Sequence, residues 1–263
     1  KFTNNKYGVG VNSGTDALRI ALMAAGIKKD DEIITVSNTA VPTVCAIVDC
    51  GAKPIFVDIN ERDFLIDVSK VEEKINKKTK AIIPVNLYGQ SADYEKINKI
   101  AKKFNLKVIE DCAQSAGSFY KGKPSGSNGD LAAFSFYPTK ILGAYGDGGM
   151  VVTNNKNYFI KAKKLRKYGM SKLYYSEFHG VNSRLDEVQA AILNYQLSQL
   201  NKNVLKRRRI AKIYDENIKN DKLIKPTESK NNFHGYYIYV VRHPQRNKLM
   251  SYLRKNNVFC NIS

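Results

Sequence analysis

Short β-rich runs alternate with helical segments along this chain, and the alternation restricts its fold more than any other feature of the sequence. The run at residues 81–85 is entirely apolar, whereas residues 16–25 and 94–104 carry apolar side chains at helical spacing. Strands that alternate with helices form parallel sheets, because a parallel connection needs a long crossover. The order predicts an α/β fold, a three-layer sandwich with helices on both faces of a mostly parallel sheet.

The expected elements follow from this spacing and from the glycines and prolines between them. We expect strands at residues 7–12, 32–36, 54–57, 81–85, 107–110, 131–135 and 150–153, and helices at 16–25, 43–49, 68–76 and 94–104. A long helical pattern from residue 184 to about 217 precedes residues 236–241, which alternate like a strand. With 263 residues, against roughly 150 per domain, we predict a large domain at 1–200 and a small α/β domain at 201–263.

The basic composition favours anionic partners without defining a site for them. Lys and Arg number 43 against 24 Asp and Glu, a formal net charge of +19, which attracts nucleotides or phosphorylated metabolites. The lysines are scattered among Asn and Ile, no basic patch with interleaved aromatic residues is present, and the basic run at 206–209 lies in a helical stretch. We interpret the excess charge as solvated surface and predict that the protein binds no nucleic acid.

Other features narrow the class of protein. No apolar stretch approaches the roughly 20 residues that cross a bilayer, and no signal peptide opens the sequence. We therefore expect a cytoplasmic protein that binds no membrane. The cysteines form no CxxC pair, the histidines lack metal-ligand spacing, and GxSxG and HExxH motifs are absent. We predict neither a metal site nor a disulfide framework.

Three predicted strand ends carry polar residues, and ligands of open α/β sheets bind at such ends. Residues 13–15 lie between a strand and a helix, where free N–H groups form a phosphate site, although Ser and Thr are also ordinary helix caps. Asp111 follows a strand and presents a carboxylate there, unless it only stabilises a turn. Lys140 precedes the glycine-rich residues 143–149, which allow a ligand to approach closely, unless it is a surface lysine.

Together these motifs resemble the pyridoxal 5′-phosphate (PLP) enzymes of the aspartate aminotransferase fold type I, and more narrowly the DegT/StrS-type sugar-nucleotide aminotransferases. The resemblance covers essentially the whole chain, with the motifs in the family's order. They are NSGTDAL at residues 12–18, NTAVPT at 38–43, VIEDCAQ at 108–114, FSFYPTK at 134–140 and GVNSRLDEVQAA at 180–191.

The resemblance implies roles for the reacting groups. Lys140 would form the Schiff base with the PLP aldehyde and, once displaced by substrate, act as general base and acid of the proton shift. Asp111 would pair with the pyridine nitrogen and keep it protonated, so that the ring accepts electrons. Gln114 would contact the region of the cofactor hydroxyl.

The resemblance also implies binding residues. Gly14, Thr15 and Ser135 would hold the cofactor phosphate. Asn182 would reach across a dimer interface to the partner's phosphate, which predicts a homodimer with shared active sites. Tyr137 is either a sugar contact or an aromatic side chain packed at the pocket wall, and the sequence leaves both readings open.

The implied reaction is transfer of an amino group from L-glutamate to a nucleotide-linked keto-6-deoxy sugar, with the 3-keto isomer slightly preferred over the 4-keto, for surface glycan biosynthesis. Relatives usually begin before Lys1 and continue beyond Ser263, which leaves one alternative, a truncated, catalytically silent paralogue acting as a binding or regulatory subunit. A PLP-dependent sugar dehydratase is a further alternative. Dehydratases of this scaffold replace the Schiff-base lysine by histidine, and Lys140 counts against that reading.

Overall fold

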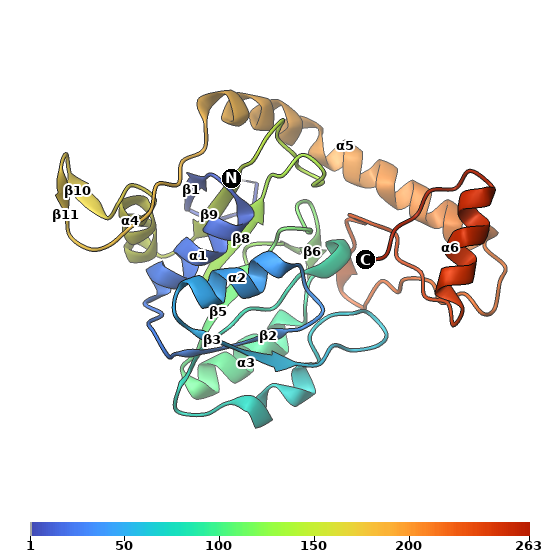
Figure 1. Ribbon diagram of the computed structural model, residues 1–263, viewed down its shortest axis with the longest axis horizontal. Helices are drawn as coiled ribbons and strands as arrows, with labels where there is room; N and C mark the ends of the chain where they lie inside the picture. Colours follow the sequence, from blue (N-terminus) through green and yellow to red (C-terminus); the bar gives the residue numbers. More distant parts are fainter. Residues whose placement is uncertain (1) are drawn as a thin grey trace.

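A seven-stranded sheet lies between two layers of helices in the computed structural model, which describes residues 2–263 (Figure 1). Its strand order is β1-β9-β8-β5-β4-β2-β3. The pairs from β8 to β3 are parallel, whereas β9 is antiparallel to both of its neighbours. The predicted α/β fold with a mostly parallel sheet is therefore confirmed. The strands are β1 (Tyr7–Val11), β2 (Glu32–Val36), β3 (Lys53–Val57), β4 (Thr79–Ile82), β5 (Lys107–Asp111), β8 (Leu131–Ser135) and β9 (Gly149–Thr153).

The helices cover the two faces of the sheet because successive strand residues point to opposite sides. Ile109 and Leu131 pack with α1 and α4 on one face, whereas Ala132 and Phe134 pack with Leu200 of α5 on the other. Helix α2 lies beside α1, and α3 packs against the parallel part of the sheet on the face opposite to α1. The helices are α1 (Gly14–Ala25), α2 (Val41–Asp49), α3 (Tyr94–Phe104), α4 (Lys156–Leu165), α5 (Glu187–Asn217) and α6 (Arg246–Lys255).

Smaller elements lie outside the seven-stranded sheet. Strands β6, β7 and β12 form a separate sheet, and β10 and β11 form a hairpin that projects beyond α4 (Figure 1). A 3-10 turn, η3, connects β4 to the segment that precedes α3. These elements span Phe119–Tyr120 (β6), Lys123–Pro124 (β7), Asn232–Phe233 (β12), Met170–Lys172 (β10), Tyr175–Ser176 (β11) and Leu87–Gly89 (η3).

The helix expected at residues 68–76 is wrong. The structure has two 3-10 turns there, η1 (Val68–Lys70) and η2 (Glu72–Lys74), with Val71 between them. Val71 is fully buried, whereas both turns lack a buried residue. A nine-residue stretch held by one buried side chain is too short to sustain an α-helix, which gains most of its stability from a packed face.

The strand expected at residues 236–241 is also wrong. Tyr236 has a φ of 46°, in the left-handed region, which interrupts the extended conformation. The backbone of this segment bonds to other groups in place of a neighbouring strand: the Tyr236 N–H donates to Nδ1 of His234, and the Tyr237 N–H donates to the Tyr88 carbonyl. The alternating pattern reflects packing of Ile238 and Val240 against the core between β2, β4 and α3, without a β ladder.

The basic run at residues 206–209 is not only solvated surface. Arg207 donates to the carbonyls of Tyr236 and Tyr237 at 3.2 and 3.0 Å. Arg208 forms a two-point ion pair with Glu228 at 2.8 and 3.2 Å. Two of the four basic side chains therefore attach the C-terminal segment to α5.

Helix α5 runs through the domain boundary predicted at residue 200 without a break. Near its start, Gln189 accepts a hydrogen bond from the Tyr145 N–H at 2.9 Å, so this helix contacts the glycine-rich loop as well as the C-terminal segment. The division into domains stays a prediction. Within residues 2–263, no helix combines the length and apolar character needed to span a membrane.

Candidate active site

Three strand ends carry the predicted site residues. Strands β5 and β8 are parallel neighbours, so Asp111 and Ser135 end at the same edge of the sheet. Strand β1 leads into α1 two strands away, and a Cβ added to Gly14 would lie 2.5 Å from the Ser135 Cβ. The structure therefore brings the end of β8 against the first turn of α1.

The first turn of α1 has the donors of an anion site. The Ser13 hydroxyl caps the helix by accepting from the Asp16 N–H at 3.1 Å. The N–H groups of Gly14 and Thr15 have no acceptor within residues 2–263, and they lie at the positive end of the helix dipole. Because Gly14 has no side chain, the backbone and the Ser135 hydroxyl remain close enough to bind one anion together.

Asp111 is a buried carboxylate at the end of β5. One oxygen accepts from the Thr43 hydroxyl at 2.8 Å, and the other accepts from the Ala113 N–H at 3.1 Å. Burial raises the pKa of Asp111, and the hydroxyl of Thr43, the amide of Ala113 and the charge of Lys140 oppose that rise. No ion pair within residues 2–263 involves this carboxylate, which suits it to a cationic ligand.

Lys140 lies in the turn after β8, and its Nζ is 4.8 Å from the centre of the Tyr237 ring. The Tyr237 hydroxyl is in turn 3.3 Å from the Thr139 hydroxyl. Lys140 is therefore half-buried beneath the C-terminal segment and is not a fully exposed surface lysine. Tyr237 was missed by the sequence reasoning, because its contact with Lys140 joins residues far apart in the chain.

Gln114 follows the same strand as Asp111 and accepts a hydrogen bond from the Tyr88 N–H at 2.7 Å. Its amide N–H groups have no partner within residues 2–263, and they can donate to an oxygen of a ligand. Tyr137 is exposed, which leaves its two readings open.

Asn182 is exposed and is not brought to the other predicted residues within this chain. It precedes Ser183, whose buried hydroxyl donates to the Asn12 side chain and accepts from the Asn12 N–H, both at 3.1 Å. The segment before α5 is thereby fixed to the end of β1. The Asn182 side chain stays free to meet another molecule.

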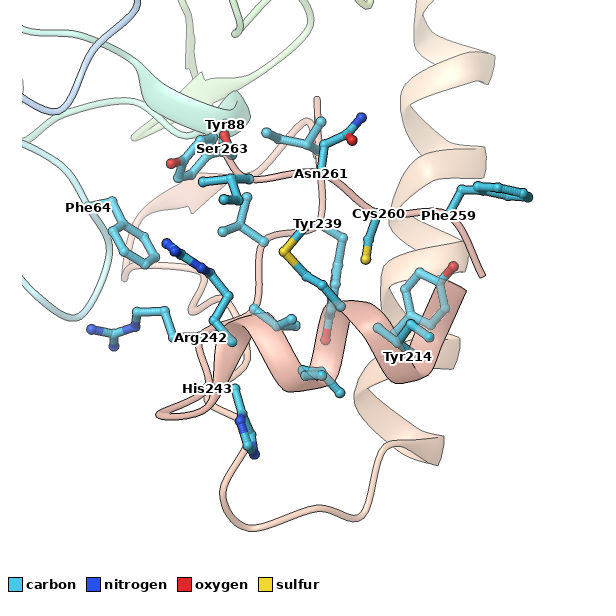
Figure 2. A pocket seen from close by; sticks show the side chains of 18 of the residues that line it. Phe64, Tyr88, Tyr214, Tyr239, Arg242, His243, Phe259, Cys260, Asn261 and Ser263 are labelled. Atoms are coloured by element: carbon cyan, nitrogen blue, oxygen red, sulfur yellow. The ribbon is translucent and has the colours of Figure 1, made fainter. Parts of the chain in front are cut away.

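A large cavity lies between α5, α6 and residues 236–241 (Figure 2). Its volume is about 1310 Å³. Tyr88 and Phe64 lie on one side, and α6 and the C-terminal residues lie on another. Tyr237 lines this cavity and its ring also lies 4.8 Å from the Lys140 Nζ, so this one side chain connects the cavity with the strand-end residues.

The sequence profile of the DegT/DnrJ/EryC1/StrS aminotransferase family matches residues 1–263, and the chain belongs to this family. It is 46% identical over 261 residues to dTDP-3-amino-3,4,6-trideoxy-alpha-D-glucose transaminase of Micromonospora megalomicea subsp. nigra, covering 97% of this chain and 70% of that protein. It is 49% identical over 253 residues to dTDP-3-amino-3,6-dideoxy-alpha-D-galactopyranose transaminase of Aneurinibacillus thermoaerophilus, covering 96% and 70%. The Pleiotropic regulatory protein of Geobacillus stearothermophilus is 44% identical over 260 residues, covering 98% and 70%.

The fold agrees with this assignment. The crystal structure of S. venezuelae DesV in complex with a ketimine intermediate superposes with a TM-score of 0.95 at 36% identity, covering 97% of this chain and 69% of DesV. Aminotransferases of this family use PLP. The chain is thus a PLP-dependent aminotransferase, and the resemblance inferred from the sequence motifs is confirmed.

The residues present fit this cofactor. The first turn of α1 and Ser135 enclose a small space that suits a phosphate. A Cβ on Gly14 would fill this space. The buried, unpaired Asp111 suits a protonated ring nitrogen, and Lys140 is the neighbouring amine. Thr43, which holds Asp111, was missed as a site residue. The sequence signal for it was the NTAVPT motif at residues 38–43, to which no site role was assigned.

Proposed function

We propose that this enzyme transfers an amino group from L-glutamate to a nucleotide-linked 3-keto-6-deoxy sugar, for the synthesis of a surface glycan. The two transaminase relatives described above are named for dTDP sugars that carry a 3-amino group and lack the 6-hydroxyl. These names favour the 3-keto acceptor over the 4-keto isomer. The proposal includes a cytoplasmic homodimer in which Asn182 completes the partner's site.

The charge of the cavity between α5, α6 and residues 236–241 carries the assignment of a nucleotide-linked acceptor. Among the described residues that line it are Arg207, Arg242, Arg246 and Lys248, and no Asp or Glu. A cavity lined by cations without carboxylates favours a diphosphate. Phe64 and Tyr88 add aromatic surface on which a nucleobase can pack.

Different residues of this chain would then bind the cofactor, hold its ring nitrogen protonated and move the transferred proton. Once bound, PLP supplies an aldehyde for amines and a ring that accepts electrons. The N–H groups of Gly14 and Thr15, with the Ser135 hydroxyl, hold the phosphate and fix the orientation of the ring. The Asp111 carboxylate holds a proton on the ring nitrogen. The Nζ of Lys140 binds the cofactor and then takes and returns the transferred proton.

The test is a substrate panel. The protein, loaded with PLP, is incubated with L-glutamate and matched pairs of 3-keto and 4-keto sugar nucleotides, and 2-oxoglutarate is measured. We expect 2-oxoglutarate with 3-keto-6-deoxy acceptors and much less with their 4-keto isomers, and none with Lys140→Ala. Turnover of 2-oxo acids but of no sugar nucleotide would contradict the acceptor while leaving the aminotransferase chemistry intact.

A regulatory role without catalysis is the second candidate, favoured by the name of the Geobacillus stearothermophilus relative. The same preparation separates the two candidates. A silent subunit would stay colourless with PLP and release no 2-oxoglutarate, whereas the proposed enzyme turns yellow when loaded.

A further inference from the structure

A chain of two hydroxyl groups ends on Asp111. The Thr43 hydroxyl lies 2.8 Å from one carboxylate oxygen of Asp111, and the Thr39 hydroxyl lies 2.8 Å from that of Thr43. A carboxylate only accepts hydrogen bonds, so the single hydroxyl proton of Thr43 goes to Asp111 and Thr39 donates to Thr43. The direction of both hydrogen bonds is therefore fixed.

The backbone holds Thr43 in this place. Thr43 lies in the first turn of α2, after Pro42, and its N–H donates to the Ala40 carbonyl at 3.1 Å. Its side chain is 1% exposed. A buried threonine has few rotamers, so the hydroxyl approaches Asp111 from a fixed direction, and the dipole of α2 adds positive potential at the same end.

The hydrogen bond from Thr43 favours the charged form of Asp111. Burial raises the pKa of this carboxyl, and the Thr43 hydroxyl is the largest opposing influence, ahead of the Ala113 N–H and the charge of Lys140. When two bases compete for one proton, a weaker base leaves the proton on the other. A hydrogen bond that weakens Asp111 as a base thus favours a proton on a ring nitrogen paired with it.

We propose that Thr43 is a positioning residue for Asp111: its hydroxyl, supported by Thr39, orients the carboxylate and keeps the shared proton on the cofactor's ring nitrogen. The inference rests on the proposed pairing of Asp111 with that nitrogen. Thr43 touches neither the substrate nor the transferred proton, and acts only through Asp111.

The experiment uses PLP labelled with ¹⁵N in the ring, bound to the full protein. In the wild type, the ¹⁵N resonance should report a protonated ring. Thr43→Val keeps the shape but removes the hydroxyl, and should shift the resonance toward the unprotonated value. It should also weaken PLP binding about tenfold, or about 1.4 kcal/mol, as for loss of one hydrogen bond to a charged group. Thr43→Ser should restore both values.

Thr35→Val is the matched control. Thr35 is as buried as Thr43, but its hydroxyl donates to the Ile83 carbonyl at 2.9 Å and does not contact Asp111. This variant should leave the resonance unchanged, which separates a general effect of losing a buried hydroxyl from the effect on Asp111.

Asp111→Asn distinguishes failure of the inference from failure of the pairing on which it rests. If Asp111→Asn shifts the resonance and Thr43→Val does not, the role of Thr43 is wrong and the pairing stands. If neither variant shifts it, the pairing itself is wrong. An equal shift in Thr43→Val and Thr43→Ser would also overturn the proposal, because the hydroxyl would then be irrelevant.

Discussion

The buried carboxylate of Asp111 destabilises the protein without its cofactor and would favour the binding of PLP. A buried carboxylate without a cation is unfavourable, and the two hydrogen bonds to Asp111 compensate for that only in part, since its pKa remains raised. A cationic ring nitrogen would remove the conflict. The binding of the cofactor and the stability of this strand end are therefore coupled.

Asp111→Asn should leave cofactor binding partly intact but slow the proton-transfer step by about 10²–10³-fold, because a neutral amide cannot hold the charge of the ring. The measurement is the single-turnover rate with L-glutamate. Asp130→Asn serves as control, since Asp130 accepts from the Val108 N–H at the opposite end of these strands. A wild-type rate for Asp111→Asn would make Asp111 a structural cap.

Lys140 should be the residue to which PLP is attached, because its charge acts on Asp111 and its amine lies 4.8 Å from the centre of the Tyr237 ring, which lines the cavity. Borohydride reduction of the loaded protein, followed by peptide mapping, should give one pyridoxyl group, on the peptide that contains Lys140. Lys140→Arg should take up no reducible label. A pyridoxyl group on another lysine would exclude the assigned role.

Among the helices, α1 is the one proposed to bind the cofactor phosphate, through its first turn. Gly14→Ala should lower affinity for PLP more than tenfold, because the new Cβ would lie 2.5 Å from the Ser135 Cβ and force the two chain segments apart. The measurements are the PLP dissociation constant and the free energy of unfolding in urea.

Gly26→Ala is the control at the other end of the same helix. Gly26 has a φ of 89° and no atom within 4 Å of an added Cβ, so its replacement should cost about 1 kcal/mol of stability without changing PLP affinity. Equal loss of affinity in both variants would mean that Gly14 acts through helix stability alone.

The elements that could be predicted from the sequence carry their own local signals. Helix α1 has the Ser13 cap and ends at Gly26, and α3 begins at the Asp93 cap, and both helices have a regular apolar face. The helix predicted at residues 68–76 and the strand predicted at 236–241 are wrong. The conformation of the first segment depends on one buried valine, and that of the second depends on contacts with distant side chains. No local pattern encodes such contacts.

The residues of the candidate site also fall into those that the sequence predicts and those that it does not. Lys140, Asp111 and Gly14 stand in motifs at strand ends, where sequence reasoning finds them. Thr43 stands in the NTAVPT motif, but its contact with Asp111, 68 positions away, is visible only in the folded chain. Tyr237 lies outside every motif, 97 positions from Lys140. Contacts of this length are set by the packing of α2 and of the C-terminal segment.

The stability of the folded chain should depend on pH through His234. Burial lowers the pKa of His234 from 6.5 to about 4, so between these values the unfolded chain binds a proton that the folded chain does not. Stability from this group is therefore present above pH 6.5 and is lost as pH falls toward 4, by about 2 kcal/mol between pH 7 and pH 5. Urea unfolding at the two pH values measures it.

His234→Asn should remove most of that difference while keeping an acceptor for the Tyr236 N–H. His243→Asn is matched to it, because Nδ1 of His243 accepts from the Gln245 N–H with the same spacing, and it should keep the wild-type difference. An undiminished pH dependence in His234→Asn would place the titrating group elsewhere.

Two copies of the chain should be needed for activity if Asn182 serves the partner's site. Lys140→Ala and Asn182→Ala chains should each be inactive. Their equimolar mixture should regain about a quarter of the wild-type activity, because about half of the dimers are heterodimers and one of the two sites in each heterodimer is intact. Mixing Lys140→Ala with Lys140→Arg should restore nothing. No recovery in a verified heterodimer of the first pair would contradict a shared site.

Helix α5 also has a mechanical consequence. From Glu187, beside the glycine-rich loop, to Arg207, which holds the carbonyl of Tyr237, the helix is continuous, a span of about 30 Å. A tilt of about 5° at its start would displace Arg207 by roughly 3 Å, which is comparable to the 4.8 Å between the Tyr237 ring and the Lys140 Nζ. A rigid helix of this length would transmit a small rotation at its start to the C-terminal segment that covers Lys140.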